Sequence, residues 1–66
     1  MMDIPVGDYV LEVLARGGAP IRVVLSPHYA DLCELAPKLL EESGGQRYRI
    51  MRCMLDSAEL VKDRWA

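Results

Sequence analysis

Three side chains in this sequence could supply nucleophilic or metal-binding chemistry: His28, Cys33 and Cys53. A histidine can serve as the base for a cysteine nucleophile when the two side chains meet. His28 and Cys33 are five residues apart in a helical segment, so they point to different sides of the helix. For zinc, the set offers only three ligands and none of the recognised ligand spacings. We therefore predict no catalytic residue, no metal site and no cofactor.

Neither the glycine-rich segment nor the paired acids form a catalytic motif. Arg16-Gly17-Gly18 joins two strand-like segments, whereas a phosphate-binding loop leads into a helix N-terminus. Glu41 and Glu42 adjoin at an exposed helix end, where nothing traps a substrate between the two carboxylates. An enzyme is therefore not expected.

Acidic residues concentrate on one face of the segment from Ser26 to Gly45. Lys38 is the only positively charged residue in this segment, and the acids are Asp31, Glu34, Glu41 and Glu42. In a helix with a rise of 1.5 Å per residue they span about 16 Å. Carboxylates spread over that length could compete with nucleic-acid phosphates for a basic groove. The alternative is the ordinary solvated face of an amphipathic helix.

The next segment carries positive charge in the form of Arg47, Arg49 and Arg52. Arginine binds phosphate through two parallel hydrogen bonds, so these residues form an alternative nucleic-acid-binding surface. They would serve a small, dimeric nucleic-acid-binding or regulatory module. The formal net charge of −2 is unlike that of most nucleic-acid-binding proteins, which are basic. A solvated strand face that pairs with acidic residues is the competing interpretation.

Hydrophobic alternation predicts a β-hairpin before the acidic segment. Residues 8–16 alternate with period two, with Tyr9, Leu11 and Val13 on one face. Residues 17–20 are a turn cluster of glycine, alanine and proline. Alternation then resumes from Ile21 to Ser26, and it predicts that Ile21, Val23 and Leu25 point inward and Arg22 outward.

The acidic segment itself is predicted to be an amphipathic helix. Ser26 would be its N-cap, Pro27 its first residue, and Gly44-Gly45 its C-terminal cap. The apolar stripe recurs with helical spacing at Tyr29, Leu32, Cys33, Ala36, Leu39 and Leu40. Pro37 removes one backbone hydrogen bond, so the helix is kinked or split there. The stripe stays in phase across Pro37, which favours a kink.

The chain after the glycines predicts a third strand and a less certain last element. Arg47 to Ile50 alternate, and a bulge after Met51 would turn Cys53 and Leu55 inward. Residues 57–65 fit either a short helix or the return strand of a second hairpin. The fold class is therefore α+β: a small antiparallel sheet, β-β-α-β plus a C-terminal helix or strand, with one amphipathic helix packed on one face.

Size and composition limit how such a fold is stabilised. A chain of 66 residues is one domain, residues 1–66, with a small core that often needs a supplement. The two cysteines are expected to be buried thiols in a reducing cytoplasm, so a homodimer is the expected supplement. Residues 1–5 lack the basic and apolar parts of a signal peptide. No apolar run approaches the roughly 20 residues of a membrane span, so no membrane partner is expected.

In outline the chain resembles the small inhibitor proteins of phages and mobile elements, including the anti-CRISPR proteins. The features that carry this resemblance are the 66-residue chain, a βαβ unit around Tyr29–Leu40, the acidic helix face and the lack of catalytic groups. The resemblance implies a stoichiometric inhibitor that mimics DNA and occupies the basic DNA-binding site of a CRISPR effector. Asp31, Glu34, Glu41 and Glu42 would then be its partner-binding residues. A net charge of −2 is a departure, because strong DNA mimics are usually far more acidic.

Overall fold

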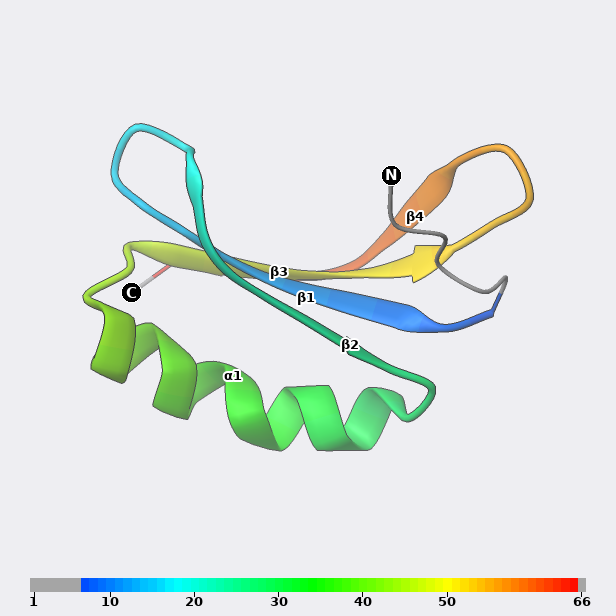
Figure 1. Ribbon diagram of the computed structural model, residues 1–66, viewed down its shortest axis with the longest axis horizontal. Coiled ribbons are helices and arrows are strands. Elements are labelled where there is room, and N and C mark those ends of the chain that lie inside the picture. The colour runs from blue at the N-terminus through cyan, green and yellow to red at the C-terminus, as the bar shows by residue number, and fades with distance from the viewer. Residues whose placement is uncertain (1–6, 66) are drawn as a thin grey trace.

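Four alternating apolar segments form one antiparallel sheet, and the amphipathic segment forms a single helix that packs across one face of it (Figure 1). The computed structural model describes residues 7–65, so the expectation of no signal peptide in residues 1–5 lies outside the described residues. The elements are β1 (Tyr9–Leu14), β2 (Pro20–Ser26), α1 (Tyr29–Ser43), β3 (Arg47–Cys53) and β4 (Ala58–Trp65). The strands are ordered β2-β1-β3-β4. The α+β fold class is confirmed, and the last element is a strand.

The core lies between α1 and the two central strands. Its buried residues are Leu11 and Val13 on β1, Leu32 and Ala36 on α1, and Tyr48 and Ile50 on β3. Tyr29, Cys33, Leu39 and Leu40 pack around them, so the predicted apolar stripe of the helix is confirmed. Leu35 also packs against the core, although the predicted stripe did not include it.

The inward face of β2 is the opposite of the predicted one. Leu11 pairs with Val24, so Val24 lies on the helix side together with Arg22. Ile21, Val23 and Leu25 were expected to point inward. They lie on the other face and are 41%, 48% and 37% exposed, respectively. A register shift between Val13 and Leu14 leaves Ile21 without a partner and sets this phase. A slip of one residue moves every side chain of a strand to the other face.

The helix begins later than predicted and is not split. Ser26 is the last residue of β2, and its hydroxyl oxygen accepts a hydrogen bond from the His28 backbone N–H at 3.0 Å. His28 is the N-cap and makes no side-chain capping bond. Pro37 lies inside one continuous helix, so the proposed split is wrong. The C-terminal cap is confirmed, since Gly44 is left-handed at φ 70°.

The bulge predicted in β3 lies in β4. β3 pairs with β1 in regular register from Arg47 to Arg52. Against β4 the register shifts between Ile50 and Met51, and Val61 is the unpaired residue. Cys53 is buried, but on the face of the sheet away from α1, because its neighbour Arg52 pairs with Tyr9 on the helix side. Leu55 lies in the connecting turn and is 83% exposed, so neither residue points inward as predicted.

One edge of the sheet extends beyond the helix. A helix about 10 Å wide cannot cover four strands, because strands spaced by about 4.8 Å span roughly 14 Å. Among the described residues α1 contacts β1, β2 and β3 but not β4. The helix-side face of β4 is therefore not covered by α1.

Candidate interaction surfaces

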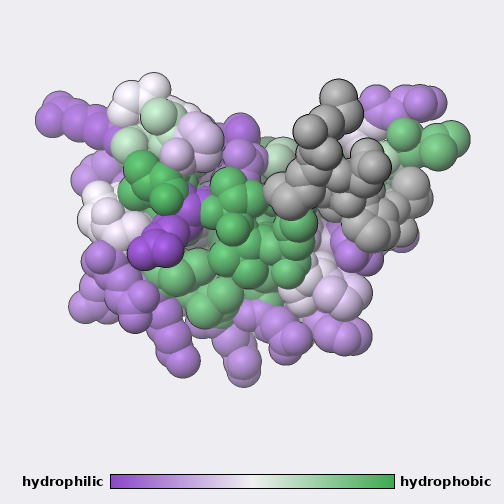
Figure 2. Space-filling model, in the orientation of Figure 1, coloured by the Kyte–Doolittle hydropathy of each residue, from purple (hydrophilic) through white to green (hydrophobic). Residues whose placement is uncertain are grey.

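The predicted acidic residues form one exposed face of α1, here called the acidic ridge. Asp31, Glu34, Glu41 and Glu42 are all exposed, and so is Lys38 within the same stripe. Figure 2 shows hydrophilic side chains along the side of the helix turned away from the sheet. Within residues 7–65 none of these carboxylates takes part in an ion pair. The structure therefore brings the four predicted residues together on one exposed face, with Lys38 among them.

Packing on the opposite side of α1 holds the acidic ridge in place. Leu32 is 1% exposed and Ala36 is fully buried against the sheet. The first turn is held by the rings of Tyr9 and Tyr29, whose centroids lie 5.4 Å apart. The pKa of Tyr29 is raised, first by its hydrogen bond with the Cys33 side chain and then by burial. The carboxylates therefore project from a fixed scaffold.

Two of the three predicted arginines are already engaged in ion pairs on the outer face of the sheet, which we define as the face away from α1. Arg49 Nε lies 3.0 Å from Glu12 Oε1. The Arg47 guanidinium donates two hydrogen bonds of 2.7 Å to the two carboxylate oxygens of Asp63. Its Cζ also lies 5.0 Å from the ring centroid of Trp65. Pairing raises the pKa of Arg47 and lowers that of Asp63, in both cases first through their hydrogen bonds.

Arg52 does not belong to the same surface as Arg47 and Arg49. It pairs in register with Tyr9, which packs against the core on the helix side, so it lies on the opposite face from the other two. The predicted arginine surface is therefore divided between the two faces of the sheet. Two of its three charges also have carboxylate partners.

The thiols and the histidine lie apart. Cys33 is half-buried on α1, Cys53 is buried on β3, and neither forms a disulfide within the described chain. His28 is exposed at the start of the helix. No group of three or more His, Cys, Asp or Glu suited to a metal ion occurs among residues 7–65. No helix in that part of the chain has the length and apolar character to cross a membrane.

The outer face of the sheet exposes apolar side chains on both edge strands. Ile21, Val23 and Leu25 belong to β2, and Leu60 and Trp65 belong to β4. Figure 2 looks onto the β2 edge of the sheet and shows hydrophobic surface there that extends toward α1. Exposed apolar patches of this kind mark association sites in many proteins. Formation of a homodimer stays a prediction.

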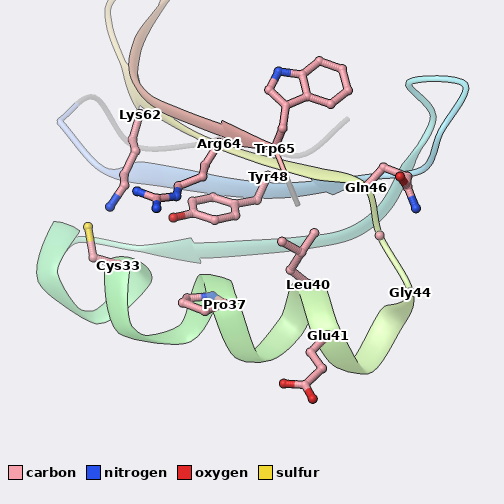
Figure 3. Close-up of a pocket in the computed structure, with 11 residues that line it drawn as sticks. Cys33, Pro37, Leu40, Glu41, Gly44, Gln46, Tyr48, Lys62, Arg64 and Trp65 are labelled. Carbon is pink, nitrogen blue, oxygen red and sulfur yellow. The ribbon is translucent and has the colours of Figure 1, made fainter.

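One groove was not predicted from the sequence. It lies between α1 and the β3–β4 pair, and its lining includes Tyr48, Lys62 and Arg64 (Figure 3). Lys62 and Arg64 are two residues apart, a spacing that places both on one face of a strand. The sequence did not decide whether residues 57–65 form a helix or a strand. The two-residue spacing of Lys62 and Arg64 places them on one face only in a strand, so it could not be used to predict the groove.

No protein-family model, no curated protein and no solved structure matches this chain. Its function must therefore be argued from the surfaces described above.

Proposed function

We propose that this protein is a non-enzymatic inhibitor that binds, as one stoichiometric partner, to the basic nucleic-acid-binding site of another complex. The acidic ridge is the contact surface. The observation that supports this most directly is that its four carboxylates share one exposed helix face and form no ion pair within residues 7–65. A CRISPR effector is the first partner to test, because of the resemblance to anti-CRISPR proteins.

The physical basis of the proposal is competition with phosphate. A nucleic-acid-binding groove presents lysine and arginine side chains that attract phosphate oxygens and release counterions on binding. Carboxylates held along one side of a helix can occupy the same cations. Because α1 is fixed by its buried face, little backbone entropy is lost when the acidic ridge binds, and the entropy cost falls on the four exposed side chains. Binding by this mechanism weakens as salt concentration rises.

The arginine surface is the weaker alternative. Arg47 and Arg49 each have a carboxylate partner, and Arg52 lies on the opposite face. Direct binding of nucleic acid by this surface would first require those ion pairs to open. A gel-shift assay with the protein alone and duplex or single-stranded DNA at low salt is expected to show no complex. A shift that is lost in an Arg47→Gln, Arg49→Gln variant would favour the alternative.

The test of the leading proposal measures target-DNA binding by purified CRISPR effector complexes in the presence of this protein. We expect an excess of the protein to abolish DNA binding by at least one effector, and high salt to weaken the inhibition. The variant Asp31→Asn, Glu34→Gln, Glu41→Gln, Glu42→Gln is expected to lose it. Inhibition that is unchanged in this variant and in high salt would contradict the electrostatic mechanism. Inhibition of none of the effectors would contradict the choice of partner.

A charge-matched pair of variants separates the acidic ridge from total charge. Asp31→Asn, Glu34→Gln and Asp56→Asn, Glu59→Gln each change the net charge from −2 to 0. All four positions are exposed, but only the first pair lies on α1. The proposal requires the first variant to inhibit much more weakly than the second. Equal losses would show that net charge, not the acidic ridge, drives binding.

A further inference from the structure

The groove beside α1 exists because β4 extends past the helix. It has a volume of about 650 Å³, within the range of roughly 300–1,000 Å³ that is usual for small-molecule sites. One wall is α1, with Cys33, Pro37 and Leu40, and the other is the β3–β4 pair. Figure 3 shows the helix below and the two strands above, with Tyr48, Lys62 and Arg64 directed into the space between them.

Two cations project into this groove and have no carboxylate partner among residues 7–65. Arg64 pairs in register with Tyr48 and Lys62 with Ile50, so both lie on the helix side of β4. Neither forms an ion pair within residues 7–65. Asp63 lies between them in sequence, but it faces the opposite side and binds Arg47. Of the lining residues only Glu41 is acidic, and in Figure 3 its carboxylate points away from the strands.

Beside the two cations the groove has one apolar stretch of wall. Pro37 and Leu40 form the helix wall, and the ring of Tyr48 lies opposite them (Figure 3). Tyr48 is 4% exposed, and its hydroxyl has no side-chain hydrogen-bond partner among the described residues. Among the described residues, every side-chain oxygen or nitrogen that is fully buried has a hydrogen-bond partner. Because the Tyr48 hydroxyl has no such partner, it is not fully buried, and it is open to the groove. In Figure 3 it points toward the end where Lys62 and Arg64 lie.

The cations and the hydroxyl therefore lie at one end of the groove, and Pro37 and Leu40 supply apolar wall beyond them, with the Gln46 amide at the far end. We infer that this groove binds a small organic anion that carries one carboxylate or phosphate group on an apolar body. The anionic group lies between Lys62 and Arg64, where charge-assisted hydrogen bonds are strongest. The apolar body lies along Pro37 and Leu40. This site shares only Glu41 with the acidic ridge, and the Glu41 carboxylate points away from the groove, so the anion does not use the ridge.

Phenylbutyrate is a suitable probe, and its neutral amide, phenylbutyramide, is a control of the same size. The binding is followed by amide chemical shifts in NMR spectra of the whole protein. We expect phenylbutyrate to shift the resonances of residues 33–41 and 62–64. We expect phenylbutyramide to bind at least about tenfold more weakly than phenylbutyrate. Phenyl phosphate is expected to shift the same resonances. Equal binding of the acid and the amide, or shifts elsewhere only, would overturn the inference.

Two variants of equal charge give the sharpest comparison. Lys62→Gln, Arg64→Gln removes the cations of the groove, and Arg22→Gln, Arg52→Gln removes two exposed cations outside it, so each variant has a net charge of −4. We expect about tenfold or greater loss of phenylbutyrate binding in the first variant only. Equal binding by both variants would overturn the site. Resonances of the groove that move on simple dilution would also overturn it, because they would show that a second copy of the chain occupies the groove.

The half-buried thiol of Cys33 provides a second readout. It lines the groove, whereas Cys53 is buried elsewhere. We expect bound phenylbutyrate to slow alkylation of Cys33 and to leave the rate at Cys53 unchanged. Alkylation of Cys33 at the same rate with saturating phenylbutyrate would place the ligand outside the groove.

Discussion

On one face of the sheet two arginines of β3 are paired with carboxylates, whereas on the other face the two cations of β4 are unpaired within the described residues. On the outer face Arg47 and Arg49 are held by Asp63 and Glu12. On the helix side Lys62 and Arg64 project into a groove and have no carboxylate partner among the described residues. The arginines of β3 are the more conspicuous cations in the sequence, yet the cations of β4 are the ones left available for an anion.

Cross-strand neighbours cause this difference. Asp63 is 16 residues from Arg47, and Glu12 is 37 residues from Arg49. The carboxylate partners therefore come from other strands, and they reach the outer face only. The density of charge along a strand is thus a poor guide to which charges can bind a ligand. Each face can be perturbed separately, and the effects should differ in size.

Removing the Tyr48 ring should have the largest effect, because packing holds the helix side together. Tyr48→Ala takes a buried aromatic side chain out of the core and is expected to cost about 3–5 kcal/mol of unfolding free energy. Urea denaturation measures this. Tyr48→Phe is the control, and it should change stability by less than about 0.5 kcal/mol, since the lost hydroxyl faces the groove. A Phe variant as unstable as the Ala variant would show that the hydroxyl holds the fold and that the groove is closed.

Gly45→Ala should have the next largest effect. A Cβ at Gly45 would collide with Cγ1 of Val13 and lie 3.1 Å from Cδ1 of Leu40 and 3.3 Å from the carbonyl oxygen of Leu14. Val13 is fully buried, so it cannot move away easily. We expect a loss of about 1–3 kcal/mol by urea denaturation. Gly44→Ala meets no neighbouring atom and is expected to cost about 1 kcal/mol, through its left-handed φ alone. A larger cost at Gly44 would contradict the steric explanation.

Removing one member of an outer-face ion pair should have a smaller effect. Glu12→Gln breaks the bond to Arg49, whose side chain is 35% exposed, and is expected to cost roughly 0.2–1 kcal/mol. Lys62→Gln removes a cation with no carboxylate partner in the described chain and should change stability by less than about 0.5 kcal/mol. Thermal unfolding at low salt measures both changes in stability. A cost at Lys62 that exceeds the cost at Glu12 would reverse the comparison between the two faces.

Acid should abolish the contribution of the Arg47–Asp63 pair, with the smallest effect of the series. Hydrogen bonds from Arg47 hold the pKa of Asp63 below its usual value, so ionised Asp63 stabilises the fold above its unfolded pKa of about 3.9. This stability is lost as the pH falls through the lower pKa of the folded state. The difference in melting temperature between wild type and Asp63→Asn should be constant above about pH 5 and shrink below about pH 4. A difference that stays constant into strong acid would show that protonation of Asp63 is not coupled to unfolding.

Local periodicity was sufficient to predict most of the fold. The alternation of Tyr9, Leu11 and Val13 predicted β1, and the spacing of Leu32, Ala36 and Leu39 predicted α1, because side-chain direction repeats every two residues in a strand and every 3.6 in a helix. The glycine pair ended the helix where it was expected to end. The four carboxylates of the acidic ridge were also placed correctly on one exposed face of α1.

Prediction failed where the outcome depends on distant partners. Ile21, Val23, Val24 and Leu25 are all apolar, so their alternation could not decide which face β2 buries. The bulge opposite Val13 and Leu14 decided it. In the same way residues 57–65 fit two periods, and pairing with β3 made them a strand.

The amino-acid pattern thus specified the class of the fold, the single helix and its acidic ridge, because these depend on the conformation of neighbouring residues. Tertiary structure decided which arginines are neutralised, which edge strand α1 leaves uncovered and where Lys62 and Arg64 meet an apolar wall. Those features arise from contacts between residues far apart in the chain, and no local period encodes them.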